Sequence, residues 1–433
     1  MIFKIFNTFK LLKLFNTFKL SNPFKLSNPF NPYKLFNPYK LFKLCGLFGL
    51  FGLLGCTESL VTGGSEGSMD WHVFRGDSAL SGYTAAKLPE KPKLLWTYKG
   101  NFRTSASPVV DKGTTYWCDK RGHIRGVDLN GNEVFEYDLQ TAVEATPVIH
   151  DSTLFVGRID GKMTALSLAS KDTLWTYETM GQISASPNIV NFGGRKAVVF
   201  GSYDNYLYCL DYRTGALISR FESGYYINGA VAVSGNFAIF GGCDSWLRVI
   251  DCRTGIANDS LHFDASLPAS PAIAGEFCYV ADYSGNVYEA VLDGGKIARH
   301  RKILKPEHEN SSMISVPALD GETVYVLADE RYLYAISRKA SHDPAKSGET
   351  NAQGERTIKW KYLLKGNVGD SSPLVCGERI VVCTKTGVIS VINARDGSLE
   401  WEYDAGEQII GSPAVIDGHL FILTSKGTLF CFG

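Results

Sequence analysis

The chain has 433 residues, 45% hydrophobic and 12% aromatic, with 44 basic and 44 acidic side chains. This composition is typical of a well-packed β protein and excludes a disordered chain. Eight lysines and no acid precede Glu58, so 36 basic side chains face 44 acidic ones in the rest of the chain, a net charge of −8. Nucleic-acid binding needs a basic surface, so we expect no nucleic-acid partner.

Residues 1–43 repeat a few short words, such as FNTFKL and NPYKLF. Asn-Pro steps recur in them and would interrupt any helix. We interpret this segment as a low-complexity basic leader; an amphipathic segment lying on a membrane surface is the alternative.

Residues 44–56 form a short apolar run that follows Lys40 and Lys43 and ends at Cys56. The run is too short to cross a bilayer, which needs about 20 residues, but a basic flank before a short apolar core is typical of a secretory signal. The ending Leu53-Leu54-Gly55-Cys56 resembles a bacterial lipobox, which implies lipidation at Cys56; an ordinary signal peptide with a chance cysteine is the alternative. Residues 57–69, rich in Gly and Ser, then read as a flexible tether.

A 14-residue pattern, LFVGRIDGKMTALS at Leu154–Ser167, describes two short strands joined by a tight turn. It recurs without gaps seven more times. Each copy follows a Ser-Pro or an equivalent pair, with Gly229-Ala230 standing in once, and precedes a Gly-containing turn and a strand with an aromatic residue. Four antiparallel strands in about 42 residues make one propeller blade. The further copies are residues 115–128, 198–211, 238–251, 278–291, 324–337, 380–393 and 420–433.

The two ends of the repeat array are complementary. The last unit holds three strands, and the first is preceded by an unpaired fourth-strand match at Leu94–Tyr98. Pairing these ends would remove two open strand edges. The sequence therefore predicts an all-β, eight-bladed propeller over residues 70–433, closed by an N-terminal strand that completes the last blade. Residues 338–355 are polar and interrupt the spacing, which predicts a mobile surface insertion.

The units SPVV, LFVG, GKMTALS and LWTY resemble the repeats of pyrroloquinoline-quinone-type (PQQ-like) propellers, as does the segment from Trp71 to Tyr83. That group includes quinoprotein dehydrogenases, which bind the quinone and Ca²⁺, and non-enzymatic lipoproteins such as the outer-membrane assembly factor BamB. Length, blade count and the expected anchor match the second branch. The adjacent Cys-Cys pair of many quinoprotein alcohol dehydrogenases is absent from the sequence. Fold alone does not decide function.

No catalytic, cofactor-binding or metal-binding residue emerges from the pattern. The histidines are scattered without metal-ligand spacing. Eight cysteines follow Cys56, and an even number in an exported protein invites disulfides. However, Cys118 and Cys383 occupy a strand column that elsewhere holds Gly, and Cys209 and Cys431 share a column with Ala, which favours buried thiols that act as small hydrophobic residues.

The turns inside the repeat and the loops leading into each blade are predicted to share one face of the ring. Turn chemistry alone accounts for Asp followed by Gly or Asn at these positions, and a binding face is the functional alternative. Exposed tyrosines would serve as anchors for a protein partner. The candidate binding-face residues are Arg103, Arg121, Glu144, Asp160, Asp204, Tyr225, Tyr226, Asp244, Glu330 and Lys426.

These observations predict a monomeric, non-enzymatic scaffold without a cofactor, lipid-anchored in the bacterial cell envelope at the outer membrane and facing the periplasm. Its expected partners are proteins, with barrel-assembly components as the first candidates. A PQQ- and Ca²⁺-dependent dehydrogenase is the alternative, and a ligand- or glycan-binding propeller is a further one.

Overall fold

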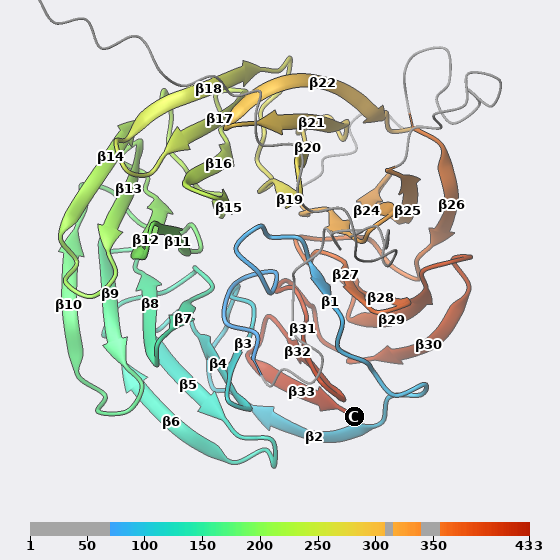
Figure 1. Ribbon diagram of the computed structural model, residues 1–433. Coiled ribbons are helices and arrows are strands. Elements are labelled where there is room, and N and C mark those ends of the chain that lie inside the picture. The colour runs from blue at the N-terminus through green and yellow to red at the C-terminus, as the bar shows by residue number, and fades with distance from the viewer. Residues whose placement is uncertain (1–69, 308–314, 339–355) are drawn as a thin grey trace, which may run out of the picture. The chain divides into compact units, whose positions relative to one another are not determined.

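The computed structural model describes residues 70–307, 315–338 and 356–433, and every regular element in these ranges is a β-strand. Four-stranded antiparallel sheets form eight blades arranged in a ring (Figure 1), as the sequence predicts. Within the same ranges no helix offers a membrane span. The leader, the signal with Cys56, the tether and the insertion after Arg338 lie outside the described residues.

In each of blades 1 to 4 the chain runs from the innermost strand to the outermost one. The strands are β3 (Val109–Asp111), β4 (Thr114–Cys118), β5 (His123–Val127) and β6 (Glu133–Asp138); β7 (Val148–His150), β8 (Thr153–Gly157), β9 (Lys162–Ser167) and β10 (Thr173–Glu178); β11 (Asn188–Phe192), β12 (Arg195–Gly201), β13 (Tyr206–Asp211) and β14 (Leu217–Glu222); β15 (Ala232–Ser234), β16 (Phe237–Gly241), β17 (Trp246–Asp251) and β18 (Ile256–His262).

Blades 5 to 8 repeat this order, and blade 8 takes its outermost strand from the N-terminal side of the chain. The strands are β19 (Ala272–Ala274), β20 (Phe277–Ala281), β21 (Val287–Asp293) and β22 (Lys296–Leu304); β23 (Ala318–Leu319), β24 (Thr323–Ala328), β25 (Tyr332–Ser337) and β26 (Ile358–Leu363); β27 (Leu374–Cys376), β28 (Arg379–Cys383), β29 (Val388–Asn393) and β30 (Leu399–Asp404); β31 (Ala414–Ile416), β32 (His419–Leu423), β33 (Thr428–Phe432) and β2 (Leu94–Lys99).

Strand β2 pairs antiparallel with β33, with Trp96 opposite Cys431 and Tyr98 opposite Leu429. This confirms the predicted closure, and no blade is left with a missing outer strand. The middle strands are buried on both sides because each blade stacks between two others. Strand β9, for example, has four consecutive buried residues, whereas the outer strand β10 alternates mainly exposed with more buried positions.

The hydrophobic core lies between the blades. Trp175 of β10 contacts blade 3, where its indole Nε1–H donates to the carbonyl oxygen of Tyr212 at 3.0 Å. Gly215, in the next turn, lies against the indole so closely that a Cβ there would be 2.6 Å from the ring. Trp96 with Gly131 and Trp360 with Gly397 repeat this arrangement. The turn glycines therefore provide both a left-handed backbone and room for the aromatic residue of the preceding blade.

A ring of hydroxyl groups joins the blades where the innermost strands begin. The N–H of Ser412 donates to Ser107 Oγ at 2.8 Å, and the N–H of Ser107 donates to Thr146 Oγ1 at 2.8 Å. Three more bonds of this kind continue the series, from Thr146, Val316 and Ser372. The series lacks an acceptor at Gly229 and at Val316, which carry no hydroxyl. The Ser of the Ser-Pro pairs is thus a contact between blades, and Pro stands just before the strand.

The chain before β2 closes the opposite end of the ring, where the first and second strands of each blade turn. This closing segment, residues 71–87, bonds to the innermost strands or their turns all around the ring. Trp71 forms an antiparallel bridge with Val110 of blade 1, and β1 (Tyr83–Thr84) adds a parallel fifth strand to blade 7. Between them, carbonyl oxygens accept N–H groups of Ile149, Val233, Ile273, Leu319 and Val375.

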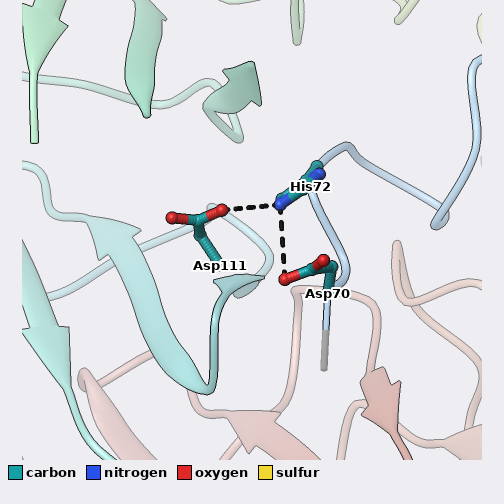
Figure 2. Close-up of side chains that lie close together, drawn as sticks. All are labelled: Asp70, His72 and Asp111. Carbon is teal, nitrogen blue, oxygen red and sulfur yellow. Dashed lines mark hydrogen bonds and ion pairs between the residues drawn. The ribbon is translucent and has the colours of Figure 1, made fainter. Parts of the chain in front are cut away.

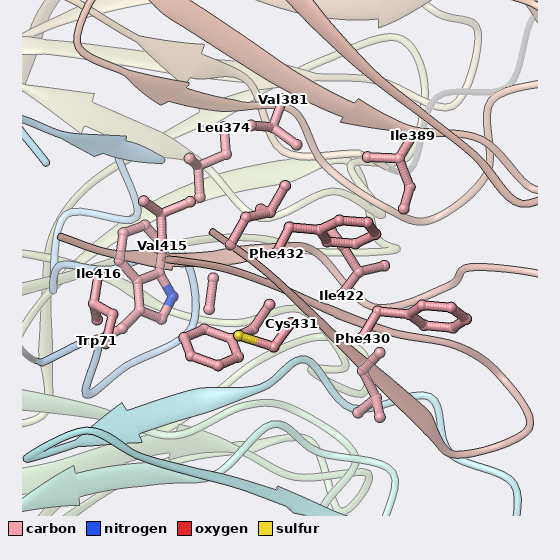
Figure 3. Packing of buried hydrophobic residues seen from close by; sticks show 14 of the residues in the cluster. Trp71, Leu374, Val381, Ile389, Val415, Ile416, Ile422, Phe430, Cys431 and Phe432 are labelled. Atoms are coloured by element: carbon pink, nitrogen blue, oxygen red, sulfur yellow. The ribbon is translucent and has the colours of Figure 1, made fainter. Parts of the chain in front are cut away.

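The closing segment is buried as well as hydrogen-bonded. Trp71 packs against the core of blades 7 and 8, beside Val415 and Ile416 (Figure 3). Arg75 is 2% exposed and donates to the carbonyl oxygens of Pro317, at 3.0 Å, and of Pro373. Burial lowers the pKa of the Arg75 guanidinium to about 9, and the charge of Asp77 opposes this shift. The sequence resemblance covers this segment but does not reveal its path.

All eight cysteines of the described residues are free thiols, and seven of them are buried. This agrees with their prediction as small hydrophobic residues. Burial raises the pKa of the Cys278, Cys376, Cys383 and Cys431 thiols to about 12, so these thiols stay protonated at neutral pH. Cys243 is the partly exposed one.

Candidate functional site

The loops between blades and the turns between second and third strands lie together at the end of the ring away from the closing segment. We call this end the loop face. Backbone hydrogen bonds join several of the described loops to the turns on both sides. In the loop before blade 2, for example, the N–H of Val143 donates to Asp119 O at 3.3 Å, and Ala142 O accepts the N–H of Ile159 at 3.2 Å. Such contacts between backbones hold the loop face rigid.

The structure places all ten candidate residues on the loop face, and four of the eight charged ones form ion pairs. Glu144 contacts Lys120 at 3.1 Å, and Asp160 contacts Arg158 at 2.6 Å. Asp244 accepts from Arg248 at 2.9 Å, and Lys426 lies 3.6 Å from Glu407. These pairs are formed within a blade or between neighbours, so they are not one collected charged site.

The remaining polar candidates mainly shape the loops. Asp204 accepts hydrogen bonds from the N–H of Met180 at 2.9 Å, the N–H of Tyr206 at 3.1 Å and the hydroxyl of Tyr208 at 2.7 Å. Glu330 has a left-handed backbone, with φ of +62°, and its carbonyl oxygen accepts the N–H of Val368.

Both arginine candidates on blade 1 also take part in loop contacts. The carbonyl oxygen of Arg103 accepts the N–H of Lys120, and the Arg121 guanidinium lies 6.0 Å from the centroid of the Phe102 ring. Turn formation therefore explains much of the polar pattern.

Three tyrosines and a methionine form an aromatic patch on blades 3 and 4. Tyr226 stacks on Tyr203, with ring centroids 4.6 Å apart, and Tyr225 lies 4.3 Å from Tyr226. Met180 is 94% exposed, and its N–H bonds to Asp204, next to Tyr203. Tyr225 is 47% exposed. The aromatic patch, defined as Met180, Tyr203, Tyr225 and Tyr226, offers apolar surface on a fixed backbone.

Two members of the aromatic patch, Met180 and Tyr203, are not predicted from the sequence, although the repeat contains a pattern that marks the position of Tyr203. The turn position just before the Asp column holds Ile159, Tyr203, Cys243 and Tyr283 in blades 2 to 5. In blades 1, 6, 7 and 8 the same position holds Lys120, Asp329, Lys385 and Ser425. Turn positions are usually polar, so four apolar residues in succession mark one side of the loop face. Tyr283 and Ile159 are both exposed.

The loop face shows no donor set for a metal within the described ranges. The described ranges contain one group of three donors from His, Cys, Asp or Glu within 4.8 Å of one another. It consists of Asp70, His72 and Asp111 and lies at the closed end. Ca²⁺ takes six to eight oxygen ligands, several of them carboxylates. Within the described ranges, no group of three carboxylates gathers in this way at the loop face.

A family model described as "Outer membrane protein assembly factor BamB" matches residues 89–220, 179–353 and 351–432. Together these segments cover most of the chain. The chain belongs to this family. Its membership agrees with the predicted PQQ-like resemblance and with the eight-bladed ring.

Solved structures support the same fold. BamB from Moraxella catarrhalis is 16% identical, covers 79% of this chain and 97% of its own, and superposes with a TM-score of 0.62. A europium-containing methanol dehydrogenase is 12% identical, covers 84% of this chain and 98% of its own, and superposes with a TM-score of 0.66. At these identities the likeness shows the fold alone, and both a family member and an enzyme share it.

One curated relative matches a short segment. The beta-alanine-activating enzyme of Mus musculus is 29% identical over 107 residues, which are 23% of this chain. The match spans 8% of that enzyme's length, so its activity does not extend to this chain.

Proposed function

We propose that this chain is a non-enzymatic, lipid-anchored scaffold that binds protein partners during the assembly of outer-membrane proteins. The observation that carries the proposal is the aromatic patch on the rigid loop face. Aromatic side chains held on a fixed backbone lose little freedom on binding and provide large apolar contact areas, which makes them frequent anchors of protein interfaces. Membership of the assembly-factor family supports barrel-assembly components as partners.

The test of this proposal is co-purification from detergent-solubilised membranes. We expect barrel-assembly components to co-purify with the parent chain and to be lost when Tyr225 and Tyr226 are both changed to Ala. Interface hot spots contribute 2 kcal/mol or more each, or about 30-fold in affinity. Leu174→Ala is the matched control, because Leu174 is an exposed apolar residue on the outer strand β10.

Two results would contradict the proposal. One is equal recovery of partners with the double variant, and the other is their consistent absence from the parent preparation. In the first case binding does not use the aromatic patch, and in the second the assembly role rests on family likeness alone.

The anchor is a separate part of the proposal and has a separate test. We propose that Cys56 is lipidated and holds the chain at the outer membrane, facing the periplasm. The lipobox-like residues before Cys56 support this. Cys56→Ser is expected to move the chain from the outer-membrane fraction to the soluble periplasmic fraction, and an unchanged distribution would contradict the lipid anchor.

A quinone-dependent dehydrogenase is the second candidate, favoured by the fold shared with methanol dehydrogenase. Incubating the purified chain with the quinone and Ca²⁺ tests it. Stoichiometric quinone binding with dye reduction by an alcohol or sugar would replace the scaffold proposal. A selective hit on a glycan array would instead support the third candidate, a glycan-binding propeller.

A further inference from the structure

A group of two carboxylates and one imidazole lies at the closed end of the ring, on the opposite side from the loop face. Its chemistry is separate from the proposed function. It contains Asp70, His72 and Asp111 (Figure 2). The sequence predicts no metal ligand here, because the residues of this group come from two segments 39 positions apart. The fold brings them together.

The register of the closing segment determines which side chains meet. Trp71 pairs with Val110 through two backbone hydrogen bonds of 2.8 and 2.9 Å. Alternate residues of an extended chain point to opposite sides. Trp71 is buried in the core, so Asp70 and His72 both point away from it, toward Asp111 at the end of β3.

The three donors are spaced as ligands of one small cation would be. His72 Nε2 lies 2.7 Å from Asp111 Oδ1 and 3.6 Å from Asp70 Oδ1. Zinc bonds to imidazole nitrogen and carboxylate oxygen are about 2.0–2.2 Å long, which puts two donors on a tetrahedral ion about 3.3 Å apart. The two measured separations lie on either side of that value, so small side-chain rotations are enough to bring all three donors onto one ion.

The surroundings orient the donors and leave one side open. The N–H of Lys112 donates to Asp70 Oδ1 at 2.8 Å, and the His72 carbonyl oxygen accepts the N–H of Ile149 at 2.8 Å. Such contacts with the ligands and their backbone hold a metal site in shape. The side chains of His72 and Asp70 are 37% and 40% exposed, whereas that of Asp111 is 12% exposed. Solvent therefore reaches the position that a fourth ligand, water, would take.

We propose that Asp70, His72 and Asp111 bind one divalent transition-metal ion, with Zn²⁺ as the best match. One imidazole with two carboxylates suits Zn²⁺ or its neighbours better than Ca²⁺, which prefers oxygen donors throughout. Binding replaces the hydrogen bond between His72 and Asp111 with two bonds to the metal. The Nε2 proton of that hydrogen bond leaves to solvent, and Nδ1 keeps its own proton or takes one up from solvent. The ion would fasten the start of the closing segment to blade 1.

Titration of the purified full chain with Zn²⁺ tests this proposal. We expect one ion per chain by calorimetry, a rise in the thermal midpoint with Zn²⁺, and weaker binding of Ca²⁺. Co²⁺ should give the visible absorption of a site with nitrogen and oxygen ligands. His72→Gln and Asp111→Asn should each weaken Zn²⁺ binding by more than about tenfold, as the loss of ligand-shell contacts does elsewhere, and abolish the thermal shift.

His419→Gln is the matched control, because His419 begins β32 at the same end of the ring but outside the group. It should bind Zn²⁺ like the parent. Thermal midpoints measured without metal show that each variant is folded. The proposal is overturned if the folded parent binds no stoichiometric Zn²⁺, if both ligand variants bind as the parent does, or if Ca²⁺ binds more tightly than Zn²⁺.

Discussion

At the closed end of the ring, residues 71–87 form hydrogen bonds with the blades, and Trp71 and Arg75 are buried there. At the loop face, by contrast, the loops bond to neighbouring turns and leave tyrosine side chains exposed to solvent. The first end satisfies the open edges of the innermost strands, which would otherwise present unpaired N–H groups. The second satisfies its backbone locally and leaves its side chains available. The closed end therefore contributes mainly to stability, whereas the loop face is where we propose that protein partners bind.

The largest loss of folding stability is expected from removing the buried Arg75 side chain at the closed end. Arg75→Met deletes the donors to the buried carbonyl oxygens of Pro317 and Pro373. Leaving these two buried carbonyl oxygens without their donor costs about 1–3 kcal/mol each. Urea titration should show a free energy of unfolding lower by that amount. Arg103→Met, at the exposed loop face, should change it by less than about 0.5 kcal/mol; equal losses would remove the contrast between the ends.

The next largest loss of folding stability is expected from the ring of hydroxyl groups that joins the blades near the loop face. Ser412 is 3% exposed, and its Oγ accepts the N–H of Ser372 at 3.0 Å. Ser412→Ala leaves that N–H buried without this acceptor, at a cost of about 1–3 kcal/mol. The same urea titration measures the loss. No change would mean that water replaces the hydroxyl.

Alkaline pH should weaken the closed end through Cys376. Its thiol donates to Ala86 O at 2.7 Å, and burial raises its pKa from 9.0 to about 12. The folded chain keeps this proton while the unfolded chain releases it above pH 9, so stability falls as pH rises from 9 toward 12. One proton contributes at most about 1.4 kcal/mol per pH unit. Unfolding measured from pH 8.5 to 10.5 should show a shallower decline for Cys376→Ala, and parallel curves would contradict this assignment.

Repairing the gap in the hydroxyl ring should stabilise the chain. A Cβ at Gly229 would lie 3.4 Å from Ser270 Oγ, an ordinary contact. Gly229→Ser therefore fits and supplies the acceptor that Ser107, Thr146 and Ser412 supply in other blades. We expect a gain of about 0.5–1.5 kcal/mol, the net value of one hydrogen bond, seen as a higher urea midpoint. A lower midpoint would show that the loop before blade 4 needs glycine.

The smallest effect on stability should come from the aromatic patch. Tyr225 is 47% exposed, so Tyr225→Ala should change the free energy of unfolding by less than about 0.5 kcal/mol. Thermal and urea unfolding check this. A larger loss would assign the aromatic patch to packing instead of binding and would weaken the proposed function.

Much of the fold follows from the repeats. The turn glycines, the aromatic residues of the outer strands and the complementary chain ends predict eight blades and the pairing of β2 with β33. The candidate site was predicted less completely. The loop face and Tyr225 with Tyr226 follow from the position of the loops, but Tyr203 and Met180 do not, because Tyr203 joins the patch by stacking on Tyr226 and Met180 by bonding to Asp204, both contacts between different blades.

The sequence by itself determined the strands, their order and the ring, because these depend on short-range patterns that occur eight times and average out local exceptions. Only the tertiary structure decided the path of residues 71–87, the aromatic patch and the meeting of His72 with Asp111. These contacts occur once and join distant positions, 298 residues apart for Arg75 and Pro373. A single contact across that distance leaves no period in the sequence, so it depends on how the closed ring brings its blades together.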